Sequence, residues 1–93
     1  MTKETVVKRI AEKTMINKCV VDEIVNEFIG EIQSALIEGN KVSIKGFGVF
    51  SVVLRKKKIG RDINKGESVV IPAHTEPVFK PGDTFRDKVY REV

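Results

Sequence analysis

A chain of 93 residues has room for one small domain, and 41% hydrophobic with 32% charged residues is the composition of a folded, soluble protein. No run approaches the ~18 consecutive apolar residues of a membrane-spanning helix, and the charged stretch MTKETVVKRIAEK lacks the pattern of a signal peptide. The single cysteine, Cys19, cannot form an internal disulfide, and one histidine with one cysteine makes no zinc site. We therefore expect a cytoplasmic protein with no metal and no cofactor.

The net charge of +4 is unevenly distributed along the chain. Residues 41–65 hold eight cations and one acid, a net charge of +7, whereas the remaining residues hold nine cations and twelve acids, a net charge of −3. A polyanion would therefore meet one basic element mounted on a mildly acidic body. This distribution favours nucleic acid as a partner.

The N-terminal part of the chain predicts two amphipathic helices. Thr2 is an N-cap candidate, and apolar residues follow it at helical spacing, which predicts a helix over residues 3–13. Asn17 is a second cap candidate, and the periodicity after it predicts a helix over residues 18–38. Gly39 is expected to end this helix, because glycine readily adopts the left-handed conformation that terminates helices.

The apolar stripe of the second predicted helix is too wide for one short helix and a small sheet to cover. Gly30 in its middle costs ~1 kcal/mol relative to alanine, and close approach of another backbone is the usual compensation. A second copy of the chain is the economical partner, so we expect an intertwined homodimer. The alternative is a monomer with a tightly packed third helix.

After Gly39 the periodicity changes from that of a helix to that of strands. KVSIK (41–45) predicts a strand, GFG (46–48) a tight turn, and VFSVVLRKKK (49–58) a long second strand. IGRDINKG (59–66) carries the turn signals Gly60, Asp62, Asn64 and Gly66, and ESVVI (67–71) predicts the returning strand.

The rest of the chain predicts one more strand and one more helix. Pro72 is expected to interrupt the strand ladder, and residues 76–80 predict a short strand. Asp83 or Thr84 is expected to cap a last helix that reaches Tyr90.

Helices followed by strands and a final helix predict an α+β fold in a single domain. Its expected parts are a helical dimerisation base at residues 1–39, a sheet at 41–82 whose arm covers about 53–72, and a C-terminal helix at 83–93.

The distal half of the long predicted strand carries Arg55, Lys56, Lys57 and Lys58 in succession. Neighbouring side chains on a strand point to opposite faces, so both faces are expected to be basic and the hairpin should project from the body. Projecting cations can pair with phosphates along a duplex with little sequence preference. A solvated edge protected from aggregation by lysines is the alternative, but it accounts for only one or two of these cations.

Ile63 is an isolated apolar residue where the hairpin is expected to turn. A hairpin tip in the minor groove can insert such a side chain between base steps and kink the duplex. Arg61 is placed to enter the groove beside it, and Gly60 and Gly66 permit close passage along the groove walls. The alternative is an incidental Ile63 that packs transiently against Ile59.

The whole chain resembles the HU/IHF family of bacterial histone-like DNA-binding proteins. The residues that carry the likeness are GFGVF (46–50), Arg55, Lys58, Gly60 and Arg61 in the arm, IPA (71–73) and FKPG (79–82). The resemblance implies an intertwined dimer with a helical base, two β-arms that embrace DNA, and a non-catalytic role in bending and compacting DNA. Because architectural proteins of this kind are known to kink DNA from the minor groove, the wedge hypothesis is not independent of the resemblance. A nucleoid-associated location in a bacterium, or in the host cytoplasm of a phage, is implied too.

The predicted DNA contacts fall into two groups. Those on the arm are Arg55, Lys56, Lys57, Lys58, Gly60, Arg61, Ile63, Asn64 and Lys65. The resemblance implies further contacts on the body at Lys3, Gly46, Gly48, Lys80 and Arg86, and a core under the DNA made by Phe47, Phe50 and Phe79. The chain departs from the family pattern at three places: Asp62-Ile63 replaces Asn-Pro, Lys65 replaces threonine, and Asp83 replaces a lysine of many relatives.

Other classes of function fit the sequence less well. His74, Thr75 and Glu76 cannot be assigned acid, base and orienting roles, and no phosphate-binding glycine motif is present, so we expect neither an enzyme nor a small-molecule substrate. The arm lacks the aromatic and leucine face of a membrane binder. A basic hairpin that binds RNA and a partly sequence-selective bending factor remain alternatives. We expect bent, nicked or flexible DNA to be preferred, because its unstacking cost is already partly met.

Overall fold

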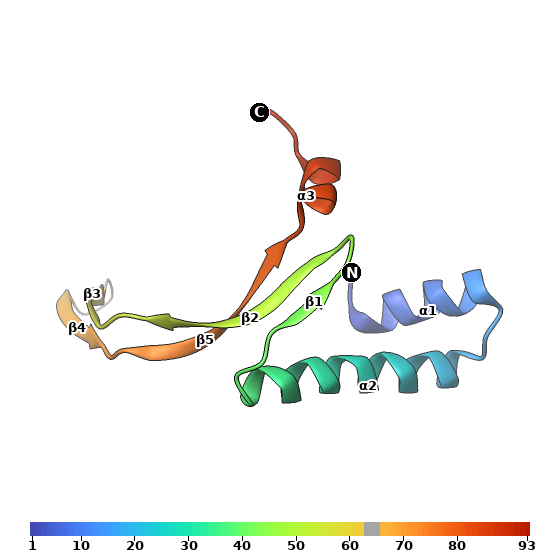
Figure 1. Cartoon of the computed structure of the whole chain (residues 1–93), viewed down its shortest axis with the longest axis horizontal. Coiled ribbons are helices and arrows are strands. Elements are labelled where there is room, and N and C mark those ends of the chain that lie inside the picture. Colours follow the sequence, from blue (N-terminus) through green and yellow to red (C-terminus); the bar gives the residue numbers. More distant parts are fainter. Residues whose placement is uncertain (63–65) are drawn as a thin grey trace. The chain divides into compact units, whose positions relative to one another are not determined.

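The computed structural model describes residues 1–62 and 66–93, and of Arg61 and Asp62 it describes the backbone. The predicted contacts Ile63, Asn64 and Lys65 lie outside the described residues. The chain divides into two compact units, Met1–Ala35 and Leu36–Val93, which are described separately (Figure 1). In the described residues two helices are followed by strands and a last helix, so the predicted α+β class is confirmed.

Helices α1 (Lys3–Thr14) and α2 (Lys18–Ile37) begin at the predicted caps and end within one residue of the predicted positions. The Thr2 hydroxyl accepts a hydrogen bond from the Thr5 amide at 3.4 Å, and the Asn17 carboxamide oxygen accepts one from the Cys19 amide at 2.8 Å. Such bonds satisfy amides that have no partner within the first helical turn. Gly39 adopts the expected left-handed backbone, with φ of 85°.

The first unit buries very little of its apolar surface. Among the described residues only Val7 and Val21 are buried hydrophobic residues. Along α2, Ile24 and Phe28 expose 59% and 54% of their surface. A Cβ added to Gly30 would meet no described atom within 4 Å, so the close approach expected there does not come from the described part of the chain itself. The wide apolar stripe predicted from the sequence is thus present and uncovered.

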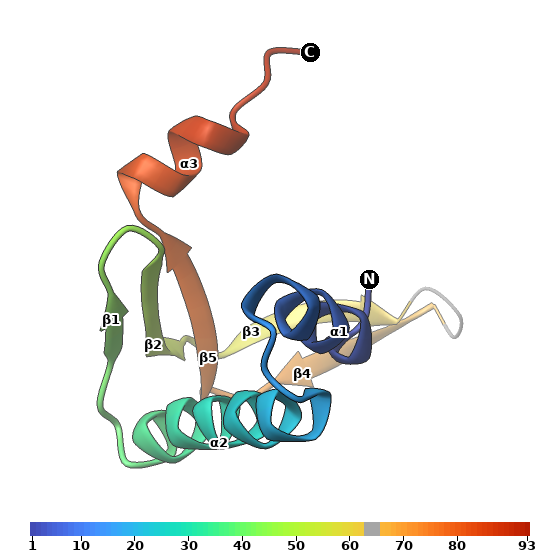
Figure 2. The ribbon, with the colours of Figure 1, turned by 90° about the vertical axis from the view of Figure 1, so that its right-hand side faces the viewer.

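Strands β1 (Val42–Ile44), β2 (Gly48–Arg55) and β5 (His74–Pro81) form an antiparallel sheet in which β2 lies in the middle (Figure 2). The predicted turn is present but lies at residues 45–47 rather than 46–48, because Gly48 begins β2, and the Phe47 amide donates to the Ile44 carbonyl at 3.0 Å. Strand β1 pairs with β2 only as far as Phe50. Beyond that point β2 and β5 continue as a two-stranded ribbon.

The arm continues from this ribbon as a separate two-stranded ladder of β3 (Lys58–Asp62) and β4 (Glu67–Ile71). The prediction of one uninterrupted strand over residues 49–58 is therefore wrong, as is the assignment of residues 59–62 to a turn. The ladder breaks at Lys56 and Lys57, opposite Pro72 and Ala73. Proline has no backbone N–H to donate, which explains the break. The last strand is also longer than the predicted 76–80.

Helix α3 (Asp83–Val89) follows β5, and its N-cap residue is Gly82, without a side-chain hydrogen bond. The predicted caps, Asp83 and Thr84, are both within the helix, so this prediction is wrong. Four phenylalanine rings meet beside the helix: Phe79 lies 4.9 Å from Phe47 and 4.8 Å from Phe50, and Phe85 lies 5.3 Å from Phe47, between ring centroids. Phe85 thereby joins the three phenylalanines that the sequence singled out.

Candidate nucleic-acid interface

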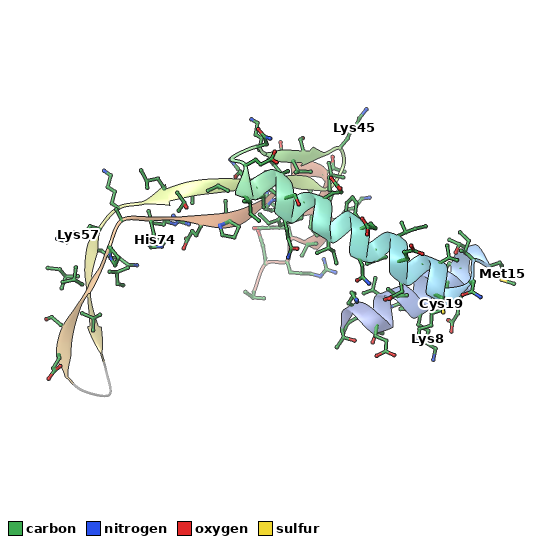
Figure 3. All side chains as sticks on the ribbon, turned by 90° about the horizontal axis from the view of Figure 1, so that it is seen from below. Lys8, Met15, Cys19, Lys45, Lys57 and His74 are labelled. Atoms are coloured by element: carbon green, nitrogen blue, oxygen red, sulfur yellow. The ribbon has the colours of Figure 1, made fainter. Side chains whose placement is uncertain are left out.

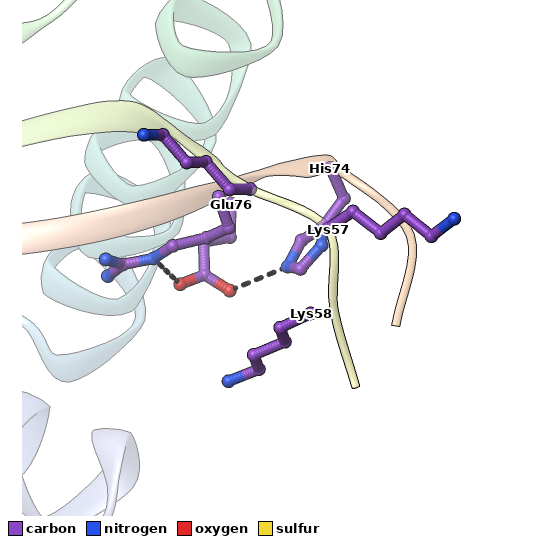
Figure 4. A pocket seen from close by; sticks show the side chains of 6 residues that line it. Lys57, Lys58, His74 and Glu76 are labelled. Carbon is purple, nitrogen blue, oxygen red and sulfur yellow. Dashed lines mark hydrogen bonds and ion pairs between the residues drawn. The ribbon is translucent and has the colours of Figure 1, made fainter. Parts of the chain in front are cut away.

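The base of the arm carries a three-membered polar cluster formed by β2 and β5. Arg55 and His74 face each other in the last pair of the β2–β5 ladder, and Glu76 is two residues further along β5. Because side chains alternate along a strand, all three lie on one face of the ribbon. The Glu76 carboxylate lies between the other two side chains (Figure 4): Oε1 accepts from Arg55 Nε at 2.5 Å, and Oε2 is 3.3 Å from His74 Nε2.

The cluster changes the acid–base properties of both of its titratable members. The hydrogen bond from Arg55, followed by the contact with His74, lowers the pKa of Glu76 below its usual value. The pKa of His74 is raised, because its Nδ1 lies 2.9 Å from the Pro72 carbonyl oxygen and its Nε2 contacts the Glu76 carboxylate. Glu76 is therefore an anion at neutral pH, and a larger fraction of His74 is protonated there than of a free imidazole, because its pKa is raised.

Cations surround this cluster at the break in the hairpin, and Figure 3 shows Lys57 and His74 at this bend. An open depression of about 490 Å³ is lined by Arg55, Lys56, Lys57, Lys58, His74 and Glu76. Lys56 and Lys57 lie between two strands, so the strand alternation that predicted two basic faces does not apply to them. The four consecutive cations are exposed nonetheless. The break gathers them at one point of the arm.

The distal ladder of the arm presents apolar side chains as well as charge. Ile59 and Val70 face each other and are exposed. A Cβ on Gly60 would lie 3.3 Å from the Ile71 Cδ1, so the glycine leaves room for that side chain. The contact between Ile63 and Ile59, weighed above as the alternative to a wedge, lies outside the described residues.

The predicted contacts on the body lie in both units, and two of their side chains, those of Lys3 and Arg86, have polar partners. Lys3 Nζ donates to the Asn26 carboxamide oxygen at 2.6 Å and lies 3.6 Å from an Asp22 carboxylate oxygen. In the second unit, Arg86 pairs with Asp83 at 3.0 Å, and Lys80 is exposed on β5. Gly46 has a φ of 80°, and Gly48 packs against the backbone of Lys80. The Gly82 amide donates to the Phe47 carbonyl at 2.9 Å, which holds the GFG turn beside the start of α3.

Sequence reasoning missed the pairing of Glu76 with Arg55 and His74. The only signal was the pattern H-x-E at 74–76, which places two side chains on one face of any strand. The partner from β2 depends on strand register, because Arg55 and Glu76 are 21 residues apart. The register depends on the break at Lys56 and Lys57, which no local signal in residues 49–58 predicts.

Comparison with known proteins shows to which family the chain belongs. The family model "Bacterial DNA-binding protein" matches residues 1–90. The DNA-binding protein HU of Thermus thermophilus is 37% identical over 89 residues, covering 96% of this chain and 92% of the relative. The integration host factor subunit beta of Pectobacterium carotovorum is 36% identical, covering 95% of each chain.

Solved structures agree with the sequence relatives. A cocrystal structure of Anabaena HU with DNA matches with a TM-score of 0.88 and 36% identity, over 96% of this chain and 97% of that one. HU from Thermotoga maritima matches with a TM-score of 0.69 and 29% identity, over 97% and 100% of the chains. The fold is that of the histone-like proteins. The chain belongs to the bacterial DNA-binding protein family that includes HU and IHF, and the resemblance read from its motifs is confirmed.

None of the helices in the described part of the chain is long and apolar enough to cross a membrane.

Proposed function

We propose that this chain is a non-catalytic, nucleoid-associated architectural protein that grips duplex DNA with basic β-arms and bends it, mostly without sequence specificity. The observation that carries the proposal is the gathering of four exposed cations, residues 55–58, at the break of a two-stranded ribbon. Cations on a narrow ribbon can reach phosphates on both sides of a groove and release counterions. Membership of the family, together with the DNA cocrystal of an HU relative, supports the same function.

The proposed DNA contacts are the arm and body residues named from the sequence. On the arm, Arg55 and Lys58 would bind phosphates, Arg61 would enter the minor groove, and Ile63 would wedge between base steps. On the body, Lys3, Lys80 and Arg86 would bind the flanking phosphates, and Gly46 and Gly48 would bring backbone amides near the DNA. For Ile63 the support is its apolar character and its position in the sequence.

A homodimer is part of the proposal, because one protomer leaves too much apolar surface exposed. Ile24, Phe28 and Ile29 on α2 are exposed, and so are Val89 and Tyr90 at the end of α3. Exposed apolar surface on this scale is typical of subunit interfaces. Two protomers would also supply two arms, which allows one DNA molecule to be held from both sides.

The first test measures how DNA affinity depends on salt. Neutralising Arg55, Lys58 and Arg61 to glutamine should reduce the slope of log affinity against log salt by ~0.9 for each lost phosphate contact. The matched control neutralises Lys8, Arg9 and Lys13, which are exposed on α1 and make the same change in net charge. A slope that stays the same in the arm variant, or that falls equally in both variants, would remove the arm from the mechanism.

The same assay separates the proposal from its alternatives. In competition among intact duplex DNA, nicked DNA and duplex RNA, nicked DNA should bind most tightly, because less stacking has to be broken. Duplex RNA should bind weakly, since its A-form minor groove is wide and shallow. Preference for RNA would favour an RNA-binding hairpin, and strong differences among DNA sequences would favour a selective bending factor.

A further inference from the structure

The cluster at the base of the arm brings an acid to the place where phosphate is expected to bind. Glu76 is the only acid among the six residues that line the depression, and its carboxylate contacts Arg55, a proposed phosphate contact. The side chains of Arg55 and Glu76 are 55% and 40% exposed, so both are accessible to a ligand. A carboxylate and a phosphate oxygen use the same guanidinium donors. Glu76 therefore occupies, in the free protein, a donor that a phosphate would use.

His74 contacts the Glu76 carboxylate through its Nε2 atom. Nδ1 faces the Pro72 carbonyl oxygen and Nε2 faces the Glu76 carboxylate. Both partners can only accept hydrogen bonds, and a neutral imidazole carries one N–H. Both contacts are therefore hydrogen bonds only when the ring is protonated. Protonation therefore places a second cation on the carboxylate, at the oxygen that Arg55 Nε does not use, and partly neutralises the negative charge that holds Arg55.

The charges that face His74 come from every element around it. Glu76 on β5 attracts the proton and Lys58 at the start of β3 repels it. The other cations that line the depression are Arg55 at the end of β2 and Lys56 and Lys57 in the break. With a neutral ring the lining carries four cations and one acid, a net charge of +3, and protonation raises it to +4. The pKa of His74 is raised above its ordinary value, because the contacts of its ring with the Pro72 carbonyl and the Glu76 carboxylate outweigh this repulsion.

We propose that Glu76 is a built-in competitor for nucleic-acid phosphate at the base of the arm, and that protonation of His74 weakens this competition, so that DNA binding strengthens as the pH falls. The inference rests on the proposed function, since it concerns the regulation of the same site. The effect grows as the pH falls through the pKa of His74 in the free folded protein, which is raised above its ordinary value. The effect is lost as the pH rises through the raised pKa of His74 in the folded protein.

The test compares four proteins on one duplex of about three helical turns at constant ionic strength, from about pH 8 to about pH 6. They are the wild type, His74→Asn, Glu76→Gln and the control Glu67→Gln, which removes an exposed acid from β4 of the same arm. Wild-type affinity should rise as the pH falls, by up to about eightfold for one added phosphate contact at 0.1 M salt. The rise should be absent in His74→Asn and retained in Glu67→Gln.

Glu76→Gln should bind more tightly than Glu67→Gln at the alkaline end, because it frees Arg55 in addition to removing one negative charge. A nuclear magnetic resonance titration gives a second readout, since His74 is the only histidine and its ring signal is unambiguous. The pKa of His74 should fall in Glu76→Gln and rise when DNA binds.

The outcomes separate the inference from the function on which it rests. If none of the four proteins binds the duplex at any pH in dilute salt, the proposed function fails. If all four bind and His74→Asn shows the wild-type rise, or Glu76→Gln binds more weakly than wild type, the inference is overturned while the function stands. If the binding assays and the titration both give the expected results, they support the inference and the proposed function.

Discussion

Gly48 has no Cβ, and this allows β2 and β5 to pack closely at this position. A Cβ there would lie 2.5 Å from the Lys80 carbonyl oxygen and 2.7 Å from the ring of Phe79. The oxygen belongs to the backbone of β5, which is paired with Gly48 through Pro81. The strands would have to separate to admit a side chain. Strand packing therefore accounts for this glycine of the GFG motif, independently of any contact with DNA.

Replacing Gly48 with alanine should lower the free energy of unfolding by about 2–3 kcal/mol, because overpacking forces the strands apart. Denaturant unfolding at one fixed protein concentration measures this change. Ser43→Ala is the control, since Ser43 is exposed on β1, and it should change the free energy of unfolding by less than ~0.5 kcal/mol. An alanine variant as stable as the wild type would contradict the packing argument.

At the scale of elements, the arm consists of two strand ladders separated by a break at Lys56 and Lys57. The sequence around these two residues does not predict the break. VFSVVLRKKK reads as one strand, and nothing within it predicts an interruption. The interruption comes from Pro72 on the returning strand, which lies opposite the break in the pairing. The sequence did predict that Pro72 interrupts its own strand. Its effect on the partner strand required the register.

Ile63→Ala should reduce DNA bending more than it reduces affinity, because affinity comes mainly from phosphate contacts and bending from the wedge. A ring-closure assay or an energy-transfer assay on end-labelled DNA measures the bend. Ile59→Ala removes an equal side chain from β3, where Ile59 is exposed, and should leave the bend unchanged. Equal bending by the wild type and Ile63→Ala would refute the wedge.

At the scale of the whole molecule, the small amount of apolar surface that the described residues bury is the dominant fact. Only Val7 and Val21 are buried hydrophobic residues among those described, and the phenylalanine cluster of the second unit is itself partly exposed at Phe47 and Phe79. A chain of this size needs more burial than this to offset the loss of conformational entropy. The proposed homodimer supplies that burial, so folding and association should be coupled.

Ile24→Glu together with Phe28→Glu should convert the proposed dimer to a monomer, because two carboxylates would have to be buried in the interface. Sedimentation measures the mass, and the wild type should also show a thermal midpoint that rises with protein concentration. Gln33→Glu is the control: it adds a carboxylate to an exposed position about half a turn around α2 from Ile24, and should stay dimeric. A wild type that is monomeric at all concentrations would contradict the proposal.

Both N-terminal helices, the GFG turn and the class of the fold were predicted because their signals are local. Thr2, Asn17 and Gly39 end or begin helices through bonds and backbone angles that involve residues no more than four positions away. The spacing of apolar residues predicted the position of the last helix. Its N-cap residue was not predicted, because Gly82 occupies the cap without a side-chain hydrogen bond. The family was predictable from motifs that are contiguous in the chain.

The sequence by itself determined the amphipathic helices, the concentration of cations in residues 41–65 and the excess of apolar surface, because periodicity and charge are properties of neighbouring residues. Only the tertiary structure decided where the arm breaks and that Glu76 lies between Arg55 and His74. Those features arise from pairing between residues that are distant in the chain: Arg55 pairs with His74, Lys58 pairs with Ile71, and Arg55 and Glu76 are 21 residues apart. Their register is set by the whole ladder and by a proline on the opposite strand.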